Sequence, residues 1–146
     1  MIVRPARSTD AGKTGAIMSE FIDTTAWMPR IHTRAEDISF CASMIDRGWV
    51  SVAEFDGAVV GFLAKEGPEV NALYVANAAQ GNGAGKALLD GAKRNAERLE
   101  LWTFQANEGA RRFYLREGFS EARETDGIEN DEQLPDVFLQ WEREAT

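Results

Sequence analysis

The sequence predicts an α/β fold of the α+β type, with a mixed sheet of six to seven strands and about four helices. Two observations favour this class. Short apolar runs bounded by turn residues alternate with stretches whose apolar residues have helical spacing. Between residues 70 and 97 a strand, a glycine-rich turn and a helix follow one another without interruption. A length of 146 residues suits one domain, so we expect residues 1–146 to form a single domain.

Capping and turn signals set the elements of the first half of the chain. Thr33 and Glu36 have the spacing of a capping box, which opens a helix that Gly48 ends. Asp56-Gly57 is a strong hairpin signal between two strands. The expected elements are a strand at 2–5, a helix capped by Ser8, Thr9 or Asp10 and running to about residue 22, a helix from 33 to 48, and strands at 49–55 and 58–64.

The second half alternates strands and short helices. The helix after the glycine-rich turn has an apolar face formed by Leu88, Leu89, Ala92, Ala96 and Leu99. The run at 99–106 is apolar on both faces, which predicts a buried strand. The other expected elements are strands at 70–76, 119–123 and 137–141 and a short helix at 110–117.

The glycine-rich turn at residues 80–85 is the strongest local signal for a ligand. Its alternate glycines let the backbone approach a ligand closely, and free N–H groups at a helix start suit a phosphate. A tight turn that binds nothing is the alternative, and glycine spacing does not separate the two. The dinucleotide fingerprint fails in both registers, at Lys86 and at Leu88. A P-loop fails because Ala87 has no hydroxyl for magnesium and Gln80 replaces the first glycine.

Two motifs carry a resemblance to a known family. The first is Gln-x-x-Gly-x-Gly at residues 80–85, directly after a strand. The second is Asn-x-x-Ala-x-x-Phe-Tyr-x-x-x-Gly-Phe at residues 107–119. Together they resemble the signatures of the GCN5-related N-acetyltransferases, the GNAT family. The resemblance covers about residues 70–119 and implies the acyl-CoA N-acyltransferase fold, with its central strands splayed at about residues 73–75.

The resemblance implies acetyl-CoA as co-substrate and no metal. Asn77 stands where the family often has proline, and Asn82 where it often has a basic residue. Lys86 and the backbone would therefore have to hold the pyrophosphate. The residues expected to bind the coenzyme are Leu73, Tyr74, Val75, Gln80, Gly81, Asn82, Gly83, Ala84, Gly85, Lys86, Asn107, Ala110, Phe113 and Tyr114.

The resemblance also implies roles in acetyl transfer. The Val75 N–H is the candidate oxyanion donor, Asn107 would hydrogen-bond the coenzyme, and Tyr114 would protonate the leaving thiolate. Without the rest of the motif, a packed aromatic would be the better interpretation of Tyr114. Glu69, at the start of the central strand, is the expected catalytic base, and Glu54 is the alternative. Exposed glutamates at strand ends are commonly inert.

Trp27, His32 and Asp131 are the expected substrate-binding residues. Trp27 and His32 belong to the loop where this fold usually builds its acceptor site. His32 is the only histidine, a residue type that can act as an acid or a base near neutral pH, although a lone loop histidine is more often solvated or packed. Asp131 belongs to an acidic C-terminal stretch that would attract a cationic amine. A solvated acidic loop is the alternative.

Bulk properties restrict the partners. A formal charge of −8 argues against non-specific nucleic-acid binding and is compatible with a cationic substrate. No apolar run approaches the roughly 20 residues of a membrane span, and the N-terminus lacks the apolar core of a signal peptide. The single Cys41 cannot form an internal disulfide. We expect no nucleic-acid or membrane partner and a cytoplasmic location, and leave a homodimer open.

These observations predict an N-acetyltransferase that moves an acetyl group from acetyl-CoA to a primary amine of a small molecule. The amine would attack directly in a ternary complex. A coenzyme-A-binding sensor that keeps the fold without turnover is the alternative, and a phosphate-binding NTPase is disfavoured by the two failed motifs.

Overall fold

The computed structural model describes residues 1–145 and contains one seven-stranded mixed sheet with four α-helices. The strand order is β1-β2-β3-β4-β5-β7-β6. The strands are β1 Ile2–Pro5, β2 Val50–Phe55, β3 Ala58–Glu66, β4 Glu69–Val75, β5 Arg98–Phe104, β6 Ser120–Thr125 and β7 Asp136–Glu142. The helices are α1 Ala11–Thr24, α2 Arg34–Asp46, α3 Ala84–Arg94 and α4 Glu108–Arg116. The predicted fold class is confirmed.

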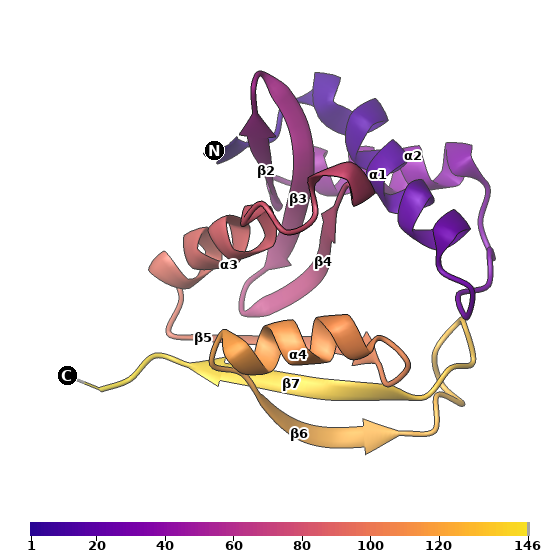
Figure 1. Cartoon of the computed structure of the whole chain (residues 1–146), viewed down its shortest axis with the longest axis vertical. Coiled ribbons are helices and arrows are strands. Elements are labelled where there is room, and N and C mark those ends of the chain that lie inside the picture. Colours follow the sequence, from indigo (N-terminus) through magenta and orange to yellow (C-terminus); the bar gives the residue numbers. More distant parts are fainter. Residues whose placement is uncertain (146) are drawn as a thin grey trace.

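Two hydrophobic clusters lie on opposite faces of the sheet. One joins α3 and α4 to the sheet through side chains such as Leu88, Leu89 and Leu101. The other joins α1 and α2 through Ile17 and Phe62. Figure 1 shows β2, β3 and β4 beside α1 and α2, and β5, β6 and β7 beside α4, as two halves that diverge.

Local signals place several elements where the sequence predicts them. Thr33 and Glu36 form the capping box, with N–H···O distances of 3.1 Å and 3.0 Å. The hairpin residues Asp56 and Gly57 have φ values of 52° and 79°, as a two-residue turn with two left-handed positions requires.

The predicted extent of the helix after the glycine-rich turn is wrong. Helix α3 ends at Arg94, so Leu99 belongs to β5 and not to the face of the helix. The Arg143 guanidinium donates hydrogen bonds to carbonyls at this helix end, including that of Ala96 at 3.0 Å. This contact joins residues that are 47 positions apart in the sequence, and it supplies the C-terminal cap that the local sequence lacks.

The prediction that the run at 99–106 forms a strand buried on both faces is also wrong, because strand β5 is buried on one face only. Leu99 and Leu101 face the core, whereas Trp102 is 40% exposed. Trp102 lies against Phe138, with ring centroids 4.9 Å apart, and under the Arg123 guanidinium at 5.1 Å. The aromatic and cationic neighbours explain why an apolar residue stands on the exposed face.

Buried polar contacts tie the segment after α1 to α2. Asp37 has 1% of its side chain exposed and accepts from the Ser19 hydroxyl at 2.6 Å and from Arg30 at 3.0 Å. Arg30 also pairs with Asp23 at 2.7 Å. Each charge is matched, which offsets the cost of removing it from water. None of the described helices is long and apolar enough to cross a bilayer.

The two halves separate between β4 and β5, the only parallel neighbours in the sheet. Their pairing is limited to Glu69 opposite Glu100. In β4, Ala72 pairs with Ala64 and Val70 with Lys65, so Asn71 is an extra residue that forms a bulge. Beyond this bulge β4 and β5 diverge, which confirms the predicted splay.

Candidate active site

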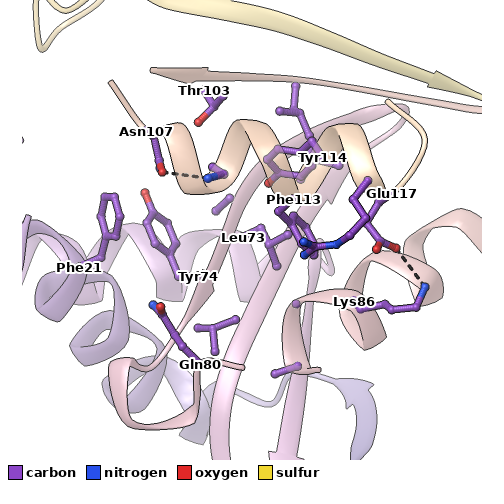
Figure 2. A pocket seen from close by; sticks show the side chains of 18 of the residues that line it. Phe21, Leu73, Tyr74, Gln80, Lys86, Thr103, Asn107, Phe113, Tyr114 and Glu117 are labelled. Carbon is purple, nitrogen blue, oxygen red and sulfur yellow. Dashed lines mark hydrogen bonds and ion pairs between the residues drawn. The ribbon is translucent and has the colours of Figure 1, made fainter. Parts of the chain in front are cut away.

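A cavity of about 530 Å³ occupies the gap between the splayed strands. Residues of β4 and β5, the glycine-rich turn, the start of α3 and one side of α4 line it (Figure 2). All the residues predicted to bind the coenzyme contribute to its lining except Asn82. The fold therefore gathers two motifs that lie about 25 residues apart in the chain around one cavity.

Two positions of β4 point backbone polar groups into this gap. Ala76 donates its N–H to the Val60 carbonyl at 2.8 Å, which fixes the alternation of hydrogen bonds between β4 and β3. Leu73 and Val75 fall at the intervening positions, so their N–H and C=O groups point away from β3. On that side β5 has already diverged. Both residues can therefore offer N–H and C=O groups to a ligand.

The glycine-rich turn presents a row of N–H groups at one end of the cavity. Gly81 and Gly83 have φ values of 85° and 84°, a conformation that side chains disfavour. Neither N–H has an acceptor among residues 1–145. The N–H groups of Ala84, Gly85 and Lys86 follow in the first turn of α3, where no intrahelical acceptor exists. Together with the helix dipole, these donors form a site suited to an anion.

Asn107 caps α4 and borders the cavity at the same time. Its Oδ1 accepts from the Ala110 N–H at 3.1 Å, as Figure 2 shows. Its Nδ2 has no partner within the described part of the chain, so the amide can still donate to a ligand. The residue thus has a structural role as well as a capacity to bind.

Tyr114 is the most enclosed polar side chain of the cavity. It is 7% exposed, and its ring lies 5.2 Å from Phe113 and 5.4 Å from Phe119. The Tyr114 hydroxyl has no hydrogen-bond partner in residues 1–145. Every fully buried side-chain polar atom in these residues does have a partner, so the Tyr114 oxygen is not fully buried and reaches the cavity surface. Burial raises the pKa of the phenol. Tyr114 is therefore a protonated donor at neutral pH.

The cations of the cavity differ from the expected arrangement. Lys86 pairs with Glu117 at 3.0 Å and with Asp90 at 3.3 Å, which raises its pKa. Its charge is therefore largely matched by carboxylates before any ligand arrives. Arg116 also lines the cavity, with its guanidinium 5.9 Å from the Phe113 ring centroid.

The two candidate bases lie outside the cavity lining. Glu69 is at the end of β4 where the strands are still paired, roughly 20 Å from Val75 at the usual rise per residue. Glu54 accepts from Arg4 at 2.8 Å on the β1–β2 side of the sheet. Neither carboxylate reaches the gap between β4 and β5 directly.

The three predicted substrate-binding residues are dispersed. Trp27 packs between Phe21 and Phe104, with centroid distances of 6.2 Å and 5.8 Å, and so joins the end of α1 to β5. His32 is exposed, with Nδ1 3.6 Å from a carboxylate oxygen of Glu36. Asp131 is exposed in the β6–β7 connection and lies outside the cavity lining.

Several lining residues were not expected. Phe21 and Met28 come from α1 and the loop after it, and Thr103 and Phe104 come from β5. A polar threonine inside the apolar run at 99–106 was the one local signal. No group of three or more metal-ligating side chains is placed to hold a metal in residues 1–145.

The family model for the acetyltransferase (GNAT) domain matches residues 46–121, which is just over half of the chain. The chain therefore belongs to the GNAT family of N-acetyltransferases. This membership confirms the resemblance carried by the motifs at residues 80–85 and 107–119.

Relatives act on different acceptors. The chain is 29% identical to the peptidyl-lysine N-acetyltransferase YiaC of Escherichia coli K12 over 92% of its own length and 94% of that protein. It is 38% identical to the 5-NmdU N-acetyltransferase of Pseudomonas phage PaMx11 over 58% of its length and 66% of that protein. YncA of Salmonella typhimurium, whose structure holds its cofactor acetyl-CoA, superposes with a TM-score of 0.75 over 100% of this chain and 96% of that one, at 22% identity.

Proposed function

We propose that this protein transfers the acetyl group of acetyl-CoA to a primary amine, within one domain formed by residues 1–146. The observation that carries the proposal is the gap between β4 and β5, where free backbone groups, an N–H-rich turn and the Tyr114 hydroxyl surround one cavity. The pyrophosphate would lie on the turn at residues 80–85, and the pantetheine arm would hydrogen-bond Leu73 and Val75.

Direct attack in a ternary complex accounts for these groups. The amine nitrogen attacks the thioester carbonyl carbon, and the Val75 N–H stabilises the negative charge that develops on the carbonyl oxygen. The carbon–sulfur bond then breaks, and Tyr114 donates its proton to the leaving thiolate. Before attack, the ammonium form of the acceptor loses one proton to solvent or to a carboxylate, which frees the lone pair. After the carbon–nitrogen bond forms, the nitrogen loses a second proton, and exchange with solvent restores the proton of Tyr114. The products are an amide and free coenzyme A.

We propose a small-molecule, cationic primary amine as the acceptor. Support comes from the formal charge of −8 and from the acidic β6–β7 connection. Two relatives are named for other acceptors, peptidyl-lysine and 5-NmdU, so a test must distinguish a small-molecule amine from an amine on a protein or a nucleic acid.

An amine-panel screen that follows free thiol release from acetyl-CoA tests the proposal. We expect thiol release with at least one small amine, accompanied by its acetylated product in the mass spectrum. A lysine-containing peptide and a single-stranded oligonucleotide that carries a primary alkylamine on one base serve as competing acceptors in the same assay. Coenzyme binding without thiol release across the panel would instead favour a sensor that keeps the fold without turnover.

A further inference from the structure

A second cavity, of about 740 Å³, lies between β5 and the β6–β7 connection. It shares Trp102, Thr103 and Phe104 with the cavity between β4 and β5, so the two meet across one strand. A molecule that lies on Trp102 and Phe104 in the second cavity is therefore in contact with the strand that also borders the first.

The second cavity combines aromatic and acidic walls. Trp102 and Phe104 provide flat apolar surface. The β6–β7 connection and its borders contribute four carboxylates, those of Asp126, Glu129, Glu132 and Asp136. Its one lining cation, Arg123, stacks over Trp102 at 5.1 Å and forms no ion pair within residues 1–145.

Glu132 differs from the other three carboxylates. Asp136 accepts from Thr125 and, at 3.3 Å, from Asn130, and Asp126 accepts from the Ile128 N–H at 3.1 Å. Glu129 is exposed to solvent. Glu132 is half-buried and has neither a hydrogen bond nor an ion pair among the described residues.

Glu132 lines the second cavity only, but its charge is near a residue of the first. Burial and then the charge of Glu132 raise the pKa of Tyr74 to about 12, and Tyr74 is a lining residue of the gap between β4 and β5. The segment that carries Glu132 is held in place, because Gln133 Nε2 donates to the carbonyls of Ile128 and Asn130 at 2.8 Å and 2.7 Å. The carboxylate is thus held by an internally hydrogen-bonded loop at the wall of the second cavity.

We propose that Glu132 binds the ammonium group of the acceptor and that the acceptor is an alkyl primary amine whose chain lies along Trp102 and Phe104. This rests on the proposed acetyl transfer and adds the residue that selects the acceptor. A partly desolvated carboxylate without a partner gains most from an incoming N–H donor with a positive charge. The aromatic surface beside it suits methylene groups.

Binding of n-pentylammonium to the acetyl-CoA-free protein tests this without turnover. The tryptophan indole N–H resonances report binding, because Trp102 lines the cavity. We expect Glu132→Gln to raise the Kd by about 10- to 100-fold, the range for a hydrogen bond to a charged group. Glu66→Gln is the matched control. It makes the same chemical change at the exposed end of β3, at a residue that lines neither cavity, so its Kd should stay within about twofold of wild type.

The outcomes separate this inference from the proposed function. Three results would each overturn the role of Glu132. These are equal Kd values for wild type and Glu132→Gln, an equal loss of affinity in Glu132→Gln and the control variant, and wild-type binding of n-pentylammonium that is no tighter than that of 1-pentanol. Binding that depends on Glu132 but never leads to an acetylated amine would support the ammonium site and contradict acetyl transfer.

Discussion

Replacing Tyr114 with Phe removes one hydroxyl and little else. The ring remains packed against Phe113 and Phe119, and the hydroxyl has no protein partner to lose in residues 1–145. The free energy of unfolding should therefore change by less than about 0.5 kcal/mol. Acetyl-CoA affinity should also be nearly unchanged, because the proposed coenzyme contacts are with the turn and with β4.

The chemical step should slow by about 100-fold or more. General acid catalysis contributes on the order of 10²–10⁴-fold, and the lower end is expected because a thiolate leaves fairly well unaided. A 100-fold loss corresponds to about 2.7 kcal/mol in the activation free energy. Because burial raises the Tyr114 pKa above its ordinary value of about 10, the phenol keeps its proton at neutral and moderately alkaline pH. Its ionisation should therefore cause no loss of wild-type rate below about pH 10.

Single-turnover acetylation at saturating coenzyme measures this step. Tyr74→Phe is the matched control, since it removes the other phenol of the same cavity. Its single-turnover rate at saturating amine should stay within several-fold of wild type. A full rate in Tyr114→Phe, or a loss confined to Tyr74→Phe, would refute Tyr114 as the acid.

Three further predictions concern the turn, the buried ion pairs and pH. Gly83→Val should weaken acetyl-CoA binding more than about tenfold, whereas the control Gly57→Val, at a similar φ and with equally open surroundings, should not. Both variants should lose roughly 1–2 kcal/mol of stability in denaturant unfolding. Equal acetyl-CoA binding by the two variants would show that the turn at residues 80–85 is purely structural. Asp37→Ala should cost about 1–3 kcal/mol in denaturant unfolding, because it leaves the buried Ser19 hydroxyl without its acceptor and removes one of the two carboxylates on Arg30, and a loss below about 0.5 kcal/mol would contradict that role. The hydrogen bond from Arg4 lowers the Asp10 pKa, so the ionised carboxylate stabilises the fold at pH values above its unfolded pKa of about 4. This contribution is lost as pH falls through the lower pKa of the folded state. Asp10→Asn should therefore reduce the dependence of the free energy of unfolding on pH in the acid range.

Local chemistry made much of the fold predictable. The capping box at Thr33 and Glu36 and the Asp56-Gly57 turn act within a few residues, so their signals are complete in the sequence. The predicted coenzyme residues also come together, because the two motifs fix the turn, the start of α3 and the cap of α4. The end of α3 was missed because Arg143, from beyond β7, satisfies its carbonyls.

The proposed acceptor side was less predictable for a physical reason. Phe104, Trp27 and Glu132 meet there from β5, the α1–α2 connection and the β6–β7 connection, and only tertiary packing sets that meeting. The sequence singles out the acidic stretch only as a group. It could not show that Asp131 is solvated while its neighbour Glu132 turns inward, because no periodic pattern exists in an irregular loop.

The most direct measurement of the central claim is the change in melting temperature on adding acetyl-CoA, compared with ATP and NAD. At about 100 times the dissociation constant, a ligand of the native state adds roughly 2.7 kcal/mol to the free energy of unfolding. We predict a clear increase with acetyl-CoA, none with ATP or NAD, and loss of the increase in Gly83→Val. A shift with ATP or NAD and none with acetyl-CoA would contradict the assignment of the gap between β4 and β5 as an acetyl-CoA site.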